Sequence, residues 1–162
     1  MIIAINQLMK SKLLKYASKS SLMDIDIFIN GERIRFNLFR ELKITEEKVS
    51  LELKNQPSYY GFITMCHKTL LKELMDLQVE EKKIYSLAYI KNKNKINPET
   101  QRVNSDDVAK SKAEKDINYL KIQRLVISKK YDVNRLENCV RAFEQRAGMM
   151  QTLSANIRNE KW

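Results

Sequence analysis

The sequence is poor in the residues that interrupt regular secondary structure. Its 162 residues include only three glycines and two prolines, which argues against a loop-rich or all-β fold. The two cysteines, Cys66 and Cys139, form no CxxC pair, so neither a disulfide framework nor a zinc site is indicated. A reducing compartment fits this cysteine content best.

Residues suited to catalysis are also scarce. His67 is the only histidine and directly follows Cys66; neighbouring residues on a helix point about 100° apart, which is poor geometry for a nucleophile and its base. The three glycines stand alone and build no phosphate-binding loop. Adjacent acids such as Asp106 and Asp107 are explained by helix capping and solvation. We therefore expect no enzyme, no metal site and no cofactor.

Long hydrophobic runs are missing as well. No stretch approaches the ~20 apolar residues of a membrane span, and the apolar run at the N-terminus is too short for a signal peptide. A hydrophobic content of 43% is nevertheless enough for a core. These features predict a soluble cytoplasmic protein with no membrane partner.

Positive charge is in excess. Thirty Lys and Arg face twenty Asp and Glu, which gives a net charge of +10 that is spread along the chain. Such a balance is typical of proteins that bind a polyanion, most often nucleic acid. Many soluble proteins are basic for no specific reason, so charge alone leaves both interpretations open.

The last third of the chain, from about residue 104 to 162, predicts one very long helix, because it contains no proline and one glycine. Asn104 or Ser105 can serve as N-cap, with two aspartates in the first turn. At roughly 80 Å, such a helix needs a partner helix from the same chain or another subunit. Its apolar residues recur at steps of three and four and change face near Asp132. One register comprises Ala113, Ile117, Leu120, Ile127 and Tyr131; the second comprises Val133, Leu136, Val140, Phe143, Ala147, Met150 and Ile157.

A second long helix is predicted from Pro57 to about Lys91, since proline suits the first turn of a helix. The polar connection that follows contains Pro98 and reads as a loop that reverses direction. The two long helices should therefore form an antiparallel pair. The apolar seam of this helix comprises Tyr59, Ile63, Cys66, Leu70, Leu74, Leu77, Ile84 and Leu87.

The N-terminal third differs from the rest. Residues 24–38 alternate between apolar and polar around Asn30-Gly31, which predicts a β-hairpin. Its Arg33 and Arg35 either meet phosphates or pair with acids across the strands. Residues 45–55 fit a short helix or a strand. Residues 1–20 form a basic arm that either touches nucleic acid or a membrane surface, or is simply solvated.

Taken together, these segments predict a mainly α fold, with two long antiparallel helices, a small N-terminal β-hairpin and an oligomeric state. Two regions are expected. Residues 1–56 contain the arm, the hairpin and the short helix, and residues 57–162 contain the helical hairpin with the oligomerisation and DNA-binding surfaces.

A basic and aromatic cluster marks the end of the first long helix. No acidic residue lies between positions 82 and 95, and two tyrosines stand at i, i+4 spacing among the lysines. Lysines neutralise phosphates and tyrosines stack on unpaired bases, the combination used by single-strand binders; a solvated helix end would look similar. The candidate nucleic-acid-binding residues are Lys82, Lys83, Tyr85, Tyr89, Lys91, Lys93 and Lys95.

The apolar seam of the C-terminal helix is the candidate contact between subunits. Arg141 and Arg146 lie close to it and either bind DNA or flank this contact. The candidate interface residues are Leu136, Val140, Phe143, Met150, Leu153 and Ile157.

The order of LKNQPSYYGF, a long helix, a polar loop and LENCVRAFEQRAGMMQTLSANIRNE resembles the phage UvsY-type recombination mediators. In this family a first long helix ends in a basic patch, here at Lys82 and Lys83. The second helix closes with an arginine, an apolar repeat and another arginine. The resemblance covers about residues 55–160, and its closing pattern falls on Arg146, Met150, Leu153 and Arg158.

Members of this family are small, basic, oligomeric proteins that bind single-stranded DNA. They help a RecA-like recombinase displace single-strand-binding protein and assemble its filament. The resemblance implies the same non-enzymatic role in DNA recombination and repair for this chain. If it is encoded by a phage, it would act in the cytoplasm of the host cell. The family's Lys-x-Arg pair falls on Leu87 and Tyr89, so Lys91, Lys93 and Lys95 would have to supply the charge. A structural or scaffolding coiled-coil protein of a virion, without DNA-binding activity, is the alternative.

Overall fold

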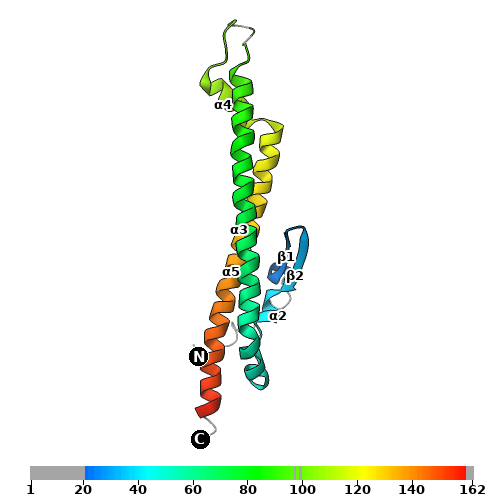
Figure 1. Ribbon diagram of the computed structural model, residues 1–162, viewed down its shortest axis with the longest axis vertical. Coiled ribbons are helices and arrows are strands. Elements are labelled where there is room, and N and C mark those ends of the chain that lie inside the picture. The colour runs from blue at the N-terminus through cyan, green and yellow to red at the C-terminus, as the bar shows by residue number, and fades with distance from the viewer. Residues whose placement is uncertain (1–20, 97, 99, 160–162) are drawn as a thin grey trace, which may run out of the picture. The chain divides into compact units, whose positions relative to one another are not determined.

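The computed structural model describes residues 21–96, 98 and 100–159 (Figure 1), so the predicted basic arm of residues 1–20 lies outside the described part. The described residues are mainly helical and include one two-stranded antiparallel sheet. The predicted fold class, long antiparallel helices with a small N-terminal β-hairpin, is therefore confirmed, while the oligomeric state remains a prediction. The elements are β1 (Asp24–Ile29), β2 (Glu32–Asn37), α2 (Leu38–Leu42), α3 (Val49–Lys93), α4 (Asp106–Glu114) and α5 (Ile117–Asn159), with short 3₁₀ helices at Ser21–Met23 and Glu46–Lys48.

Contacts group the chain into two compact units. Of the described residues, the first unit comprises 21–69 and 135–159, and the second unit comprises those between 70 and 134. Each unit holds a part of α3 and a part of α5. The boundary predicted from the sequence between residues 56 and 57 stays a prediction about folding and function, and it falls inside α3.

The hairpin forms where the alternating pattern predicts it. Asn30 and Gly31 both take positive φ, 50° and 80°, as the tight turn requires. In the register of the two strands, Ile27 faces Ile34. Since alternate side chains of a strand point to one side, β1 buries Ile25, Ile27 and Ile29 together.

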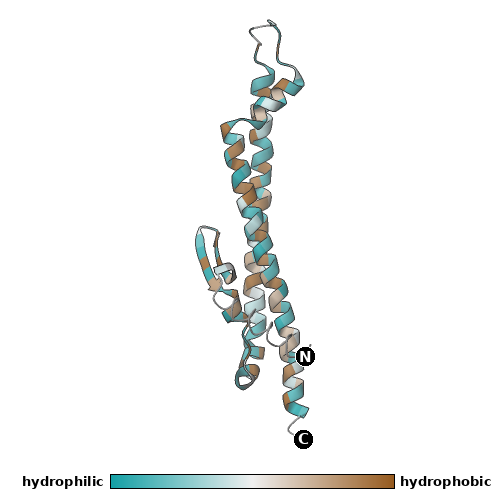
Figure 2. Ribbon diagram, turned by 180° about the vertical axis from the view of Figure 1, so that it is seen from behind, coloured by the Kyte–Doolittle hydropathy of each residue, from teal (hydrophilic) through white to brown (hydrophobic). Residues whose placement is uncertain are grey.

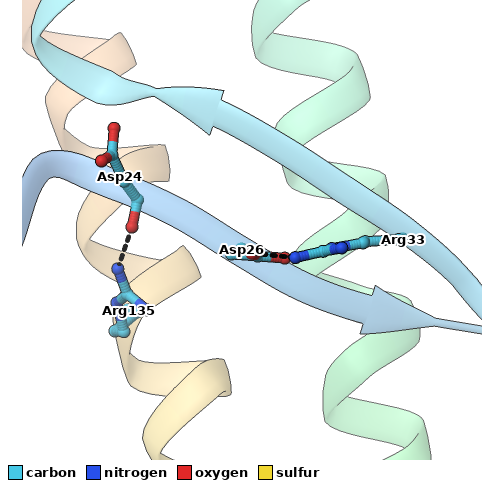
Figure 3. Close-up of polar contacts among 4 residues, drawn as sticks. All are labelled: Asp24, Asp26, Arg33 and Arg135. Carbon is cyan, nitrogen blue, oxygen red and sulfur yellow. Dashed lines mark hydrogen bonds and ion pairs between the residues drawn. The ribbon is translucent and has the colours of Figure 1, made fainter. Parts of the chain in front are cut away.

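Two arginines fix the polar side of the hairpin (Figure 3). Arg33 pairs with Asp26 through two hydrogen bonds of 2.9 and 2.7 Å, which confirms that this arginine pairs across the strands. Arg135 of α5 donates a 2.6 Å hydrogen bond to the backbone carbonyl of Asp24. An isolated hairpin is marginal in water, so this bond and the buried isoleucines explain why it is held in the first unit.

Helix α3 begins at Val49, eight residues before the predicted start at Pro57, and the prediction that proline opens this helix is wrong. Proline inside a helix removes one hydrogen bond and costs ~3 kcal/mol. Tertiary contacts of the preceding turns offset this cost. Val49 is 3% exposed, and Gln56 donates a 2.7 Å hydrogen bond to the carbonyl of Phe143 on α5.

The single helix predicted from residue 104 is also wrong, because it is interrupted between α4 and α5. Ser105 caps α4 by accepting a hydrogen bond from the Val108 N–H, as predicted for one of the two candidate caps. The break comes from Asp116, whose carboxylate accepts from the N–H groups of Asn118 and Tyr119 at 2.8 and 3.3 Å. Aspartate is a favoured N-cap, and it restarts the helix here without proline or glycine.

Within each unit the two long helices run antiparallel, because rising residue numbers on α3 meet falling numbers on α5. In the first unit Glu52 pairs with Arg146, and Gln56, further along α3, donates to the carbonyl of Phe143. In the second unit Glu73 pairs with Lys129 at 2.8 Å, and the ring of Tyr85, further along α3, packs against that of Tyr119. Hydrophobic and hydrophilic residues alternate along both helices (Figure 2). The core of the first unit includes Ile63, Cys66, Leu136, Cys139, Phe143 and Met150.

Most of the seam predicted for residues 113–131 is not covered by α3, so of the two predicted partners the helix of the same chain does not bury it. Ile117, Leu120 and Ile127 are 66%, 38% and 63% exposed, whereas Ile122 and Val126 are buried. The sequence contains apolar residues on both faces, so spacing alone did not choose between them. The exposed residues of the predicted seams are Ile117, Leu120, Ile127 and Tyr131 on α5 and Tyr59 and Leu87 on α3.

Candidate nucleic-acid interface

The candidate basic cluster lies in the second unit, on the last turns of α3 and the start of the loop to α4. This loop is held by Asn104, which is 3% exposed. Its side-chain amide donates to the carbonyl of Asn92 at 2.7 Å, and its N–H donates to the carbonyl of Lys95 at 3.1 Å. A single β-bridge between Ile96 and Val103 closes the loop. The backbone around Lys95 is thereby fixed to the end of α3.

Four of the seven candidate residues are exposed lysines. Lys82, Lys83, Lys91 and Lys95 all present their side chains to solvent. Among the described residues, only Lys83 of these four has a carboxylate within ion-pair distance, Glu80 on the preceding turn at 4.0 Å. Surface pairs of this kind contribute little, so all four lysines are available to a phosphate backbone. We call them the lysine cluster.

The other three candidates are engaged inside the unit. The rings of Tyr85 and Tyr119 lie 5.2 Å apart with a tilt of 58°. Tyr89 donates a 2.9 Å hydrogen bond to Asp106, and Lys93 pairs with the same carboxylate oxygen at 2.7 Å. The two candidate tyrosines, Tyr85 and Tyr89, are half-buried. Base stacking on these rings stays a prediction and would require a ring face that remains open to solvent.

Asp106 thus binds two of the candidate residues, Lys93 and Tyr89, at this end of α3. Its hydrogen bond from Lys93, followed by that from Tyr89, lowers the pKa of the Asp106 carboxyl. The hydrogen bond between Lys93 and Asp106 raises the pKa of Lys93, and the hydrogen bond between Tyr89 and Asp106 raises the pKa of Tyr89. The carboxylate therefore holds one candidate lysine that a phosphate would otherwise bind.

A groove between α3 and α5 in the second unit was missed by the sequence reasoning. It has a volume of about 470 Å³, and Lys91 and Lys121 lie on its two sides. Leu87 lines the groove and is 60% exposed. Lys121 could have been found only from the pairing of the two helices, because no sequence motif links it to Lys91. The aliphatic lining comprises Ile84, Leu87, Ala88, Ile122 and Leu125.

The candidate subunit contacts lie in the first unit. Leu136, Phe143 and Met150 are at most 2% exposed, because they already pack within this unit. The remaining three are half-buried: Val140, Leu153 and Ile157. Their role between subunits stays a prediction, and only the second group has surface left for a partner.

The two arginines beside this seam have different environments. Arg146 is 4% exposed and pairs with Glu52 at 2.6 Å, while Arg141 is exposed and pairs with Glu137 one turn away at 2.5 Å. A buried, paired guanidinium has no surface to offer to DNA. Of the two, Arg141 alone can meet a phosphate without a change in the fold.

No catalytic or metal-binding constellation emerges from the described part of the chain. Burial raises the pKa of the Cys66 thiol, and it raises the pKa of Cys139 to about 11, both of which disfavour the reactive thiolate. Among the described residues, no three His, Cys, Asp or Glu side chains come together as a metal site. None of the described helices has a segment that is long and apolar enough to cross a membrane.

Comparison with solved structures identifies similar folds. Crystal structures of the bacteriophage T4 recombination mediator protein UvsY, in lattice types IV, II and I, match with TM-scores of 0.64, 0.61 and 0.60. Each is 14% identical in sequence and covers 77% of this chain and 93%, 93% and 96% of the respective UvsY chain. The chain therefore has a UvsY-like fold. The sequence matches no protein-family model and no curated protein.

Proposed function

We propose that this protein is a non-enzymatic recombination mediator, which binds single-stranded DNA as a homo-oligomer and promotes loading of a RecA-like recombinase. The main support is the fold, which is shared over most of the chain with a protein named as a recombination mediator. The charge supports it independently. Residues 82–130 carry thirteen Lys and Arg against five Asp and Glu.

The DNA strand would contact the lysine cluster. Lys82, Lys83, Lys91 and Lys95 are exposed, and Lys121 adds a further cation across the groove from Lys91. Each lysine that neutralises a phosphate releases condensed counterions, so binding should weaken steeply as salt rises. The lysine cluster contains no side chain other than lysine that could recognise the edge of a base, so we expect little sequence preference.

Multivalency would make these weak contacts effective. Several subunits that contact one strand convert later contacts into intramolecular ones, so avidity replaces affinity. A strand bent or wrapped across the oligomer would be handed to the recombinase while single-strand-binding protein is displaced. Both the recombinase and the single-strand-binding protein are thus proposed partners.

The first test is fluorescence anisotropy of a labelled oligo-dT at several salt concentrations, with a duplex of equal length for comparison. We expect tight, salt-sensitive binding that favours the single strand. Alanine at Lys82, Lys83, Lys91 and Lys95 should reduce the slope of log K against log salt by roughly 0.7 for each lost phosphate contact. The matched control replaces four exposed lysines of the first unit: Lys43, Lys48, Lys54 and Lys68.

Two results would count against the proposal. Equal losses in both quadruple variants would mean that net charge, and not the lysine cluster, governs binding. A stable oligomer with no affinity for either DNA form at about 0.15 M salt would favour the scaffold protein. The loading step is tested separately, by whether the protein speeds the DNA-dependent ATPase of a RecA-like recombinase on strands coated with single-strand-binding protein.

A further inference from the structure

The hairpin of the first unit has one strand edge that no described residue covers. Ile29 and Glu32 flank the tight turn and form the hydrogen-bonded pair that closes the hairpin. Hydrogen-bonded and non-hydrogen-bonded pairs alternate along an antiparallel ladder, so Arg33 and Arg35 turn their backbone N–H and C=O groups away from β1. Within the described part of the chain, no hydrogen bond reaches these outward groups. We call them the β2 edge.

The outer edge of β1 is bound to a helix at its first residue. The carbonyl of Asp24, which points outward in the same alternation, accepts the 2.6 Å hydrogen bond from Arg135 of α5 (Figure 3). An open strand edge, by contrast, presents donors and acceptors that a further strand can pair with. The β2 edge is therefore the side of the hairpin at which a third strand can be added.

An apolar pocket lies beside β2. It has a volume of about 290 Å³, and Ile34 and Phe36 form one of its walls. Arg35 also lines the pocket, although its side chain belongs to the opposite face of the hairpin, so the pocket reaches the edge of the strand. No described residue of β1 lines it. The rest of the wall comprises Glu41, Tyr59, Phe62, Ile63 and Phe143.

The pocket can receive apolar side chains from an added strand. Its inner part is buried, since Phe143 is 2% exposed, whereas the ring of Phe62 is 54% exposed and stands at the opening. Residues opposite each other on paired strands place their side chains on the same face. The residues of a third strand that lie opposite Ile34 and Phe36 therefore point towards the pocket, and apolar side chains fit there.

The opposite face of β2 has a cation that lacks a carboxylate. Asp26 lies directly opposite Arg35 in the register, but both of its carboxylate oxygens accept hydrogen bonds from Arg33. The side chain of Arg35 is exposed, and among the described residues neither Asp26 nor Glu41 forms an ion pair with it. A residue of a third strand opposite Arg35 shares its face. An acidic residue at that position supplies the missing partner.

We propose that the β2 edge binds an extended segment of a partner protein in which acidic and apolar residues alternate. The main chain of this segment pairs with the outward groups of Arg33 and Arg35. Its apolar side chains enter the pocket beside Ile34 and Phe36, and a carboxylate meets Arg35. Strand addition of this kind takes its affinity from main-chain hydrogen bonds and its specificity from alternate side chains. The inference goes beyond the proposed function, because it uses the first unit and not the lysine cluster.

The experiment measures the fluorescence anisotropy of a fluorescein-labelled peptide of alternating glutamate and valine, titrated with the full chain. We expect saturable binding. The matched control peptide has the same composition, with its glutamates and valines in two separate blocks, and should not bind. Because it cannot place acidic and apolar side chains on opposite faces of one strand, this control separates strand pairing from attraction to net charge.

Two further peptides test the main-chain hydrogen bonds without any change to the protein. One is N-methylated on every glutamate and the other on every valine. Adjacent residues of a strand direct their N–H groups to opposite sides, so only one of the two sets faces β2. One methylated peptide should therefore lose binding and the other should retain it. Loss with methylated glutamates indicates an antiparallel third strand, and loss with methylated valines indicates a parallel one.

Variants of the protein locate the site. Arg35→Ala should weaken binding roughly five-fold, the size of one opposite-charge cross-strand pair. Arg35→Pro also lacks the outward N–H, which proline at an edge strand tolerates, and should weaken binding further with an unchanged circular dichroism spectrum. Lys68→Ala is the charge control, because Lys68 is exposed on α3 two and a half turns from Tyr59 and so on the opposite side of the helix.

The pocket is tested in the same titration. Phe62→Ala should weaken peptide binding, since it removes an exposed ring from the opening of the pocket. Met65→Ala is the matched control, because Met65 is 64% exposed on the same helix and does not line the pocket. Equal binding by these two variants would exclude the pocket as the site of the apolar side chains.

Four results would overturn the proposal. The first is a parent that does not bind the alternating peptide; if Arg35→Pro then lowers the molecular mass in light scattering, a second copy of this chain occupies the edge instead. The second is equal behaviour of the two methylated peptides. The third is equal binding by Arg35→Ala, Arg35→Pro and the parent. The fourth is displacement of the peptide by oligo-dT in the parent but not in Lys68→Ala, which would assign the binding to phosphate contacts elsewhere on the unit.

Discussion

The guanidinium of Arg146 on α5 lies 2.6 Å from the carboxylate of Glu52 on α3 and is almost wholly buried. Its other terminal nitrogen donates to the side-chain oxygen of Gln56, whose amide in turn donates to the carbonyl of Phe143. These bonds connect the first turns of α3 to α5 in the first unit. They hold the segment before Pro57 in helical form, where a proline would otherwise favour a start.

Replacing Arg146 with alanine should destabilise the protein strongly. Removing one partner of a buried ion pair leaves the other uncompensated, which typically costs several kcal/mol. Glu52 keeps some solvent contact, with a side chain that is 24% exposed. We therefore expect the free energy of unfolding to fall by roughly 3 kcal/mol, as measured by urea titration followed by circular dichroism.

Arg141→Ala is the matched control, because Arg141 pairs on the surface with Glu137 one turn away. Exposed pairs of this kind contribute ~0.3–0.5 kcal/mol. If the two alanine variants lose similar stability, the buried network does not hold the helices as described.

The comparison of Asn30 and Asp116 shows what the sequence can and cannot predict. Asn30-Gly31 is a local signal, because the turn needs two residues with positive φ and the sequence supplies them next to each other. The cap at Asp116 is just as local, but aspartate occurs at many helix positions, and no proline or glycine marks this break. A break that depends on one side chain's choice of partner is visible only in the structure.

The remaining differences between the predictions and the structure come from tertiary contacts, which the sequence does not reveal. The burial of Arg146 depends on Glu52 and Gln56, which lie about ninety residues away in the chain. The same holds for Asp106, whose pairing with Lys93 and Tyr89 across the loop leaves the four exposed lysines of the lysine cluster as the candidate site. The spacing predicted that α5 has apolar faces, but it could not tell which face packs against α3: Ile122 is buried there, whereas Ile117 is exposed.

Asp106→Asn should strengthen DNA binding. The substitution releases Lys93 from its 2.7 Å ion pair, so one more lysine can neutralise a phosphate. We expect the affinity for oligo-dT at low salt to rise by roughly five-fold, about 1 kcal/mol, with a steeper salt dependence. Asp107→Asn is the control, since it changes the net charge equally and, among the described residues, the ion pair of Lys93 is with Asp106 and not with Asp107. Equal gains in both variants would assign the effect to net charge.

Asp116→Ala should destabilise the start of α5. The carboxylate satisfies the N–H groups of Asn118 and Tyr119, and loss of an N-cap typically costs ~1 kcal/mol. Asp116→Asn keeps the accepting oxygen and should retain most of the stability. Urea titration measures both values, and equal losses in the two variants would show that charge rather than capping matters here.

The Cys139 thiol should make stability depend on pH in the alkaline range. Burial raises its pKa to about 11 in the folded chain and outweighs the opposing effect of Arg135. The unfolded thiol ionises near pH 8.5, so the unfolded state loses its proton first and folding stability falls as pH rises between these values. The loss should reach at most about 1.4 kcal/mol per pH unit. Urea titrations at pH 8 and pH 10 should therefore show a larger drop for the parent than for Cys139→Ala, which lacks the ionising group. Lysines and tyrosines titrate in both proteins and cancel in the difference, so parallel pH curves would mean that this thiol ionises equally in the folded and unfolded chain.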